Sequence, residues 1–148
     1  MTAAAAARDA LLEEVAIRNY PVDGGSIIYK GTQVCQNELG FAVPASDTAG
    51  LSGVLGIALE TRNNSAGNDG DTAVPVRSGC LANLVATSIT AAMRGQMMFV
   101  VDDQTIDDTA GSTNKIPAGI LHVFTSTTQG KVFIPLGGQH NRMSMVQR

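Results

Sequence analysis

The chain has 148 residues, of which 44% are hydrophobic and only 16% are charged, and it carries a net charge of −3. This length and composition suffice for one domain with a buried core. No Lys/Arg cluster and no long apolar run is present, which argues against a nucleic-acid-binding protein and against a membrane-spanning helix. The 16 glycines and the absence of Trp favour short strands joined by tight turns.

Residues 2–17 form the one stretch with a helical pattern, because Ala, Leu and Glu are strong helix formers. Beyond the alanines, its apolar stripe consists only of Leu11, Leu12 and Val15. A helix with so little to bury is marginal alone in water. We therefore predict an N-terminal arm, residues 1–19, that contacts another surface; the alternative is a helix docked on its own domain. The start lacks the basic residues and the hydrophobic length of a signal peptide, so we expect the protein to stay, or to be assembled, in the cytoplasm.

From Tyr20 onward, short β-prone runs alternate with Gly, Pro, Asn and Asp. No second helical pattern is available to cover a parallel sheet, so we predict an all-β, barrel- or sandwich-like domain over residues 20–137 and a tail over 138–148. Asn37–Gly40 predicts a hairpin turn, and 63–71 and 107–114 predict polar, flexible loops. The predicted strands are Ser26–Tyr29, Gln33–Gln36, Phe41–Val43, Gly53–Glu60, Thr72–Arg77, Leu81–Val85, Met97–Val101, Ile120–Thr125 and Lys131–Leu136.

Two series of similar segments indicate an internal repeat, with offsets of 60 to 64 residues between the series. We expect two half-barrels that together complete one core. Pro75 and Pro135 lack an amide hydrogen, so their strands are expected at an edge, a bulge or a barrel rim. The matched segments are Gly31–Cys35 with Gly95–Phe99, Gly56–Leu59 with Gly119–His122, and Val74–Val76 with Ile134–Leu136.

The residues that could support chemistry form no known motif. The acids lie in turn-like sequence, where carboxylates bond local backbone amides or face water. The stretch Asp102–Asp108 leaves a calcium site as an alternative, although its spacing matches no EF-hand loop. His122, expected on the exposed face of a strand, and His140 lack partners at zinc-ligand spacing. Cys35 and Cys80 favour two reduced thiols over one disulfide. We therefore predict no enzyme, catalytic residue, metal site or cofactor.

Apolar and basic residues near the two ends are the candidate contact residues. All 13 acids lie at or before Asp108, so the C-terminal part is mildly basic and suits an acidic partner. Met143 and Met145 follow the last predicted strand, and flexible thioethers there suit burial against another chain; docking on the chain's own domain is the alternative. The candidate partner-contact residues are Leu11, Leu12, Val15, Arg18, Tyr20, Arg142, Met143 and Met145.

A series of motifs resembles a family of small structural proteins of tailed bacteriophages, the capsid decoration or cement proteins. The resemblance covers about residues 18–136 and depends on the order and spacing of the motifs. The Ala-rich start and the Met-containing tail depart from the family pattern. The motifs are Ile28–Val34, Asn37–Ala45, Asp47–Gly50, Gly56–Glu60, Gly70-Asp71, Val74–Gly79, and Val100–Thr105 followed by Gly119-Ile120.

The resemblance implies a compact β-barrel-like domain bound to the outside of an icosahedral shell after expansion. Its partner would be the major capsid protein, and it would commonly act as a homotrimer, with a dimer as the alternative. It implies a place on the outer surface of the virion after synthesis in the host cytoplasm, no nucleic-acid or membrane partner, and no catalytic residue.

Two other classes of function are left open. One is a carbohydrate- or receptor-binding module of a phage head fibre, against which the absence of Trp and the presence of only two Tyr argue. The other is a small enzyme with an irregular β fold, against which the lack of a catalytic motif argues.

Overall fold

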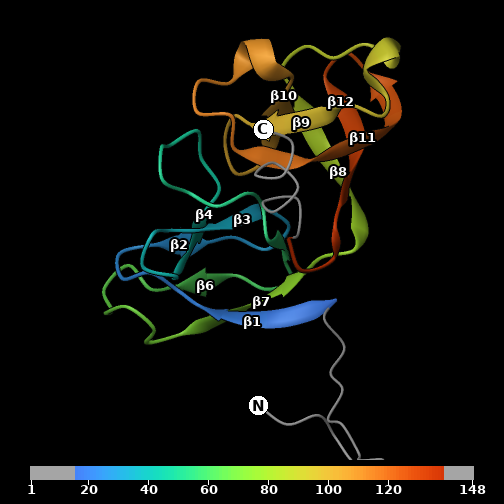
Figure 1. The fold of residues 1–148 in the computed structure, drawn as a ribbon. Helices are drawn as coiled ribbons and strands as arrows, with labels where there is room; N and C mark the ends of the chain where they lie inside the picture. The colour runs from blue at the N-terminus through green and yellow to red at the C-terminus, as the bar shows by residue number, and fades with distance from the viewer. Residues whose placement is uncertain (1–15, 139–148) are drawn as a thin grey trace, which may run out of the picture.

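The computed structural model describes residues 16–138, which form a five-stranded sheet, curled into a barrel by one isolated bridge, and an adjoining closed five-stranded barrel (Figure 1). This confirms the all-β prediction, and helical structure in this part of the chain is limited to short 3-10 turns. The strands are β1 (Ile17–Pro21), β2 (Ile27–Ile28), β3 (Gln33–Gln36), β4 (Ala42–Pro44), β5 (Gly56–Ala58), β6 (Arg62–Asn63), β7 (Ala73–Arg77), β8 (Cys80–Ala86), β9 (Met97–Val100), β10 (Thr105–Asp107), β11 (Pro117–Ser126) and β12 (Gln129–Ile134); the turns are η1 (Ala91–Met93), η2 (Thr109–Gly111) and η3 (Leu136–Gly138).

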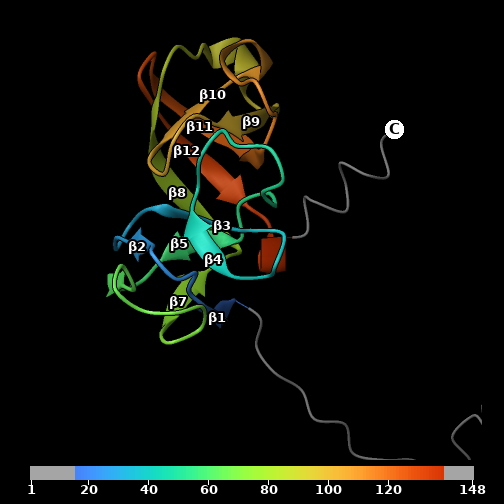
Figure 2. The ribbon, with the colours of Figure 1, turned by 90° about the vertical axis from the view of Figure 1, so that its left-hand side faces the viewer.

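The first barrel is a sheet of five strands in the order β1-β7-β5-β3-β4, and a parallel bridge between Val22 and Ala42 brings its two ends together. The second is a closed barrel of β10, β8, β12, β11 and β9, in which β10 runs parallel to β8. β2 and β6 pair with each other. Figure 2 shows β1 and β7 at one end of the molecule and β9 and β10 at the other.

The two barrels repeat the same strand pairing, residue by residue. Gln33 lies opposite Ile57 in the first barrel, and Met97 lies opposite Ile120 in the second. The pairings put β1, β3 and β4 in correspondence with β8, β9 and β10 at an offset of 64 residues, β5 with β11 at 63, and β7 with β12 at 56. The last offset is shorter because β5 and β7 are joined by a longer connection than β11 and β12.

The repeat was predicted, but the expectation of two half-barrels around one core is wrong. Each unit surrounds its own buried cluster, which includes Val34 and Val74 in the first barrel and Leu121 and Val132 in the second. The two cores adjoin because Cys35 of β3, Ala45 after β4 and Val54 before β5 pack into the cluster of the second barrel. The predicted match of Val74–Val76 with Ile134–Leu136 is also wrong, since Val76 and Val132 occupy the same place in the pairing.

A close approach between strands explains why both repeats contain a Gly-Ile pair. A Cβ atom on Gly56 would lie 2.3 Å from the carbonyl oxygen of Arg77, and one on Gly119 would lie 2.3 Å from that of Phe133. Real Cβ atoms do not come so close to backbone atoms, so both positions require glycine. The Gly-Ile motif therefore marks the place where β5 approaches β7 and where β11 approaches β12 in the same way.

The chain enters the first barrel earlier than predicted. β1 begins at Ile17, opposite Arg77, so the predicted helix does not extend to this residue, and residues 17–19 of the predicted arm belong to the sheet. Residues 1–15 lie outside the described part. β7, which contains Pro75, has neighbours on both sides and is not an edge strand, although Pro75 lies beyond the last residue paired with β5.

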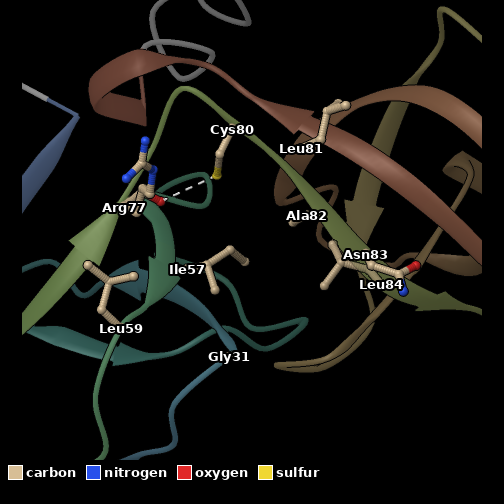
Figure 3. A pocket seen from close by; sticks show the side chains of 9 residues that line it. All are labelled: Gly31, Ile57, Leu59, Arg77, Cys80, Leu81, Ala82, Asn83 and Leu84. Atoms are coloured by element: carbon tan, nitrogen blue, oxygen red, sulfur yellow. Dashed lines mark hydrogen bonds between the residues drawn. The ribbon is translucent and has the colours of Figure 1, made fainter.

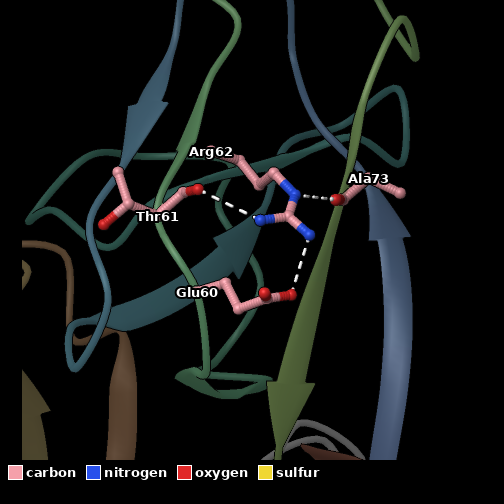
Figure 4. Close-up of polar contacts among 4 residues, drawn as sticks. All are labelled: Glu60, Thr61, Arg62 and Ala73. Carbon is pink, nitrogen blue, oxygen red and sulfur yellow. Dashed lines mark hydrogen bonds and ion pairs between the residues drawn. The ribbon is translucent and has the colours of Figure 1, made fainter.

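The connection between β5 and β7 is held by side chains rather than being the loose loop that its composition predicts (Figure 4). The Arg62 guanidinium forms an ion pair with Glu60 at 2.8 Å and donates to the Ala73 carbonyl oxygen at 3.0 Å. Asn64 is buried, and its Nδ2 donates to the carbonyl oxygens of Val22, Asp23 and Asn68. The segment is thus fastened to the first barrel.

Candidate contact surface

The two barrels contact each other through the turn between β9 and β10. The Gln33 amide donates to the Asp103 carbonyl oxygen at 2.7 Å, and the Gln33 side chain donates to that of Asp102 at 3.1 Å. Near the start of β11, the Val54 amide donates to the Pro117 carbonyl oxygen at 2.9 Å. Gln33 is fully buried, and the β9–β10 turn covers the outer face of the first barrel at this residue.

Asp47 forms a second link between the barrels. Its carboxylate accepts hydrogen bonds from the backbone amides of Thr113 and Asn114, each at 2.8 Å, and its carbonyl oxygen accepts one from the Asn114 side chain. The bond from the Thr113 amide is the main reason that the pKa of Asp47 is lowered from its usual value. The contact therefore favours the ionised carboxylate.

Four apolar side chains form a row across the outer face of the second barrel, and we call them the outer row: Leu81, Phe133, Ile120 and Met97. They lie opposite one another on β8, β12, β11 and β9, and paired residues in antiparallel strands share one face of a sheet. Their neighbours along each strand, such as Ala82 and Val132, are buried in the core. Leu81 is 48% exposed and Phe133 40%, whereas Ile120 and Met97 are half-buried. Exposed apolar side chains gathered in this way are typical of an interaction site.

The corresponding row of the first barrel has a different character. It consists of Ile17, Arg77, Ile57 and Gln33, so that two of its four positions are polar. Ile57 packs against the core of the second barrel, and Gln33 lies beneath the β9–β10 turn. In both rows the residues on the first two strands are exposed and the residue on the third is half-buried; the rows differ at the fourth position, where Gln33 is polar and fully buried and Met97 is apolar and half-buried.

Both ends of the described chain meet at one corner of the molecule, at the buried residue Ser78. The Ser78 amide donates to the Ala16 carbonyl oxygen, and its hydroxyl accepts a hydrogen bond from the Gly137 amide, each at 2.8 Å. Ile17 and Leu136 are exposed beside these two bonds. The N-terminal segment 1–15 and the C-terminal segment 139–148 are thus attached at the same corner.

A cleft of about 230 Å³ lies between the barrels, lined mainly by aliphatic groups from β5, β7 and β8 (Figure 3). The Cys80 thiol at its edge lies 3.8 Å from the Arg77 carbonyl oxygen. Burial raises the pKa of Cys35 to about 12 and also raises that of Cys80. Both cysteines are free, which confirms the interpretation as two thiols.

The acids of the Asp102–Asp108 stretch bond to local backbone, as expected for turns. An Asp102 carboxylate oxygen accepts from the Gln104 amide at 2.9 Å, and one of Asp107 accepts from the Asp108 amide at 2.8 Å. Burial, followed by the nearby charge of Asp102, raises the pKa of Asp103. Within residues 16–138 no three His, Cys, Asp or Glu side chains gather in a metal-binding arrangement. His122 is exposed on β11, as predicted.

Only two of the predicted contact residues lie in the described part. Arg18 is exposed in β1, whereas Tyr20 is half-buried and packs against the core of the first barrel. Leu11, Leu12, Val15, Arg142, Met143 and Met145 lie outside the described residues. The outer row was not predicted from the sequence. The run Val132-Phe133-Ile134 gave the available signal, because three apolar residues in succession place one of them on the outer face of a strand.

Neither a comparison with models of known protein families nor a comparison with curated protein sequences gives a match. Among the described residues, no helix is long and apolar enough to cross a membrane.

Proposed function

We propose that this protein is a capsid decoration, or cement, protein of a tailed bacteriophage. It binds the outer surface of an icosahedral shell through the major capsid protein and stabilises that shell, as a homotrimer or, alternatively, as a dimer. The protein is made in the host cytoplasm and functions on the virion. It needs no enzymatic activity, metal or cofactor for this role.

The observation that carries the proposal is the open outer row, Leu81, Phe133, Ile120 and Met97, on a chain whose two ends meet at Ser78. The small apolar surface can contact a neighbouring copy and the two terminal segments can reach the capsid, so each copy has several weak contacts instead of one deep site. An oligomer that engages several capsid subunits at once gains avidity from the combination. The ordered motifs that resemble decoration proteins support the same function.

The proposal is tested by adding the purified protein to bare, expanded capsids of the phage that encodes it. A ligand that binds only the assembled state stabilises it in proportion to RT ln(1 + [L]/Kd). We expect a saturable rise in the capsid melting temperature that persists in EDTA and weakens only slightly with salt, since exposed ion pairs contribute about 0–1 kcal/mol each. Absence of binding to these capsids would overturn the proposal, and loss of the effect in EDTA would indicate a calcium bridge at Asp102–Asp108.

A truncation separates the terminal arm from the barrels. The deletion should remove residues 1–15 and keep Ile17, because β1 begins there and pairs with β7. We expect the truncated protein to melt as the full chain does but to bind capsids about tenfold more weakly, a difference of ~1.4 kcal/mol. Unchanged binding would show that the arm makes no contact with the capsid.

A further inference from the structure

The turn between β9 and β10 has a counterpart in the first barrel, the turn between β3 and β4. The Val101 amide donates to the Thr105 carbonyl oxygen at 2.9 Å, and the Asn37 amide donates to that of Phe41 at the same distance. The strands on either side of the two turns correspond at an offset of 64 residues. Leu39 therefore occupies the place of Asp103, just as Met97 occupies the place of Gln33.

One of these two turns has a partner within the chain. The β9–β10 turn covers Gln33 of the first barrel through the carbonyl oxygens of Asp102 and Asp103. The β3–β4 turn instead presents Leu39 to solvent, and this side chain is 76% exposed. The surface that corresponds to the covered one, at Met97 and Ile120, continues into the exposed Phe133 and Leu81.

In each of the two pairs of turn and sheet residue, the two members have the same polarity. The turn and Gln33 form a polar contact, in which the backbone and side-chain N–H groups of Gln33 donate to the carbonyl oxygens of Asp103 and Asp102. Leu39 and Met97 are both apolar, and Met97 lies opposite Ile120, a further apolar residue. Burying Leu39 against the outer row would remove an exposed apolar side chain from water on both sides of the contact.

We propose that the β3–β4 turn of one copy docks on the outer row of a second copy, with Leu39 against Met97, Ile120 and Phe133. This contact between two chains has the same form as the contact of the β9–β10 turn with Gln33, which joins the two barrels within one chain. It is heterologous, because a turn on one copy meets a sheet face on the next, and such contacts generate rings when their rotation closes. The inference rests on the homo-oligomer in the proposed function and names the surfaces that form it.

Two substitutions test the contact by installing the residue found at the corresponding place in the other barrel. Leu39→Asp removes the apolar turn residue, and Met97→Gln makes the acceptor polar. Val85→Thr is the matched control, because Val85 is as exposed on the outer face of β8 as Leu81 is but lies outside the row. The full-length proteins are compared by sedimentation velocity from about 1 μM to about 1 mM, with melting curves to verify folding.

We expect the parent protein and the Val85→Thr control to self-associate and each of the two variants to do so at least about tenfold more weakly. An equimolar mixture of the variants should form dimers and no larger species, because Leu39→Asp retains the acceptor and Met97→Gln retains the turn. A parent protein that stays monomeric, or variants that associate like the parent, would overturn this inference. Capsid binding, measured in parallel, reports on the proposed function separately: a monomer that still binds capsids leaves that function standing.

Discussion

Asn64 joins the carbonyl oxygens of Val22 and Asp23, which follow β1, to that of Asn68 in the connection before β7. Replacing it with Ala removes one donor from each of these oxygens and leaves each with a single backbone N–H, and each hydrogen bond contributes about 1 kcal/mol. We expect Asn64→Ala to lower the free energy of unfolding by about 2–3 kcal/mol in urea titrations. Asn63→Ala, at an exposed neighbour, is the control, and equal effects of the two substitutions would contradict the role of Asn64.

Asp47 gives the contact between the barrels a dependence on pH. Its folded-state pKa is lowered mainly by the hydrogen bond from the Thr113 amide, so its contribution to stability is present above the unfolded pKa of about 3.9 and is lost as pH falls through the folded value. We expect Asp47→Asn to destabilise the protein by about 1 kcal/mol at pH 6, and the difference from the parent to disappear near pH 2 in chemical unfolding. A difference that stays constant over this range would contradict the account.

Two strands, β5 and β11, each depend on one glycine. Gly56→Ala and Gly119→Ala would each press a methyl group against a backbone carbonyl, and we expect each to cost about 3 kcal/mol or more. Gly31→Ala is the control, because Gly31 has a positive φ of 87° but no atom near its Cβ position, so it carries only the backbone strain of about 1 kcal/mol. Thermal unfolding measures all three, and equal losses would show that the close approach does not matter.

Strands whose residues alternate or are rich in Val and Ile could be predicted from the sequence. The predicted strand Gln33–Gln36 has the ends that the structure shows, because the turn-forming residues Gly31 and Asn37 lie on either side of it. β1 was missed because its Arg, Asn and Pro residues carry no strand pattern, and only the pairing of Ile17 with Arg77 makes it a strand. The short β10 is absent from the predicted strands because Asp residues surround Ile106, whose burial depends on closure of the second barrel.

The candidate site was harder to predict than the fold, for a physical reason. The open outer row exists only because four strands align Leu81, Phe133, Ile120 and Met97, and register is not visible in a single strand. The corner at Ser78 joins residues 16 and 137, and such long-range contacts leave no local pattern. The terminal residues singled out from composition, such as Leu11 and Met143, lie outside the described part.

At the scale of the whole molecule, the repeat of strand pairing gives two related faces with different surroundings. Gln33 of the first barrel is fully buried beneath the β9–β10 turn, whereas the corresponding Met97 of the second barrel is half-buried and shares its row with the exposed Phe133 and Leu81. Of the two turn-to-sheet contacts that the repeat allows, one is formed within the chain, between the β9–β10 turn and Gln33, and the other is the contact that we propose between copies. This arrangement suits a protein that works as part of a larger assembly.

The central claim, that the protein decorates the outside of a phage capsid as an oligomer, is tested most directly by a cryo-EM map of purified virions. We expect density for a pair of adjoining five-stranded barrels on the outer surface of the shell, with neighbouring copies in contact. The fitted density should place each chain end, next to Ser78, toward a capsid subunit or a second copy. A shell without this density would contradict the decoration function, and isolated single copies on the shell would contradict the oligomer.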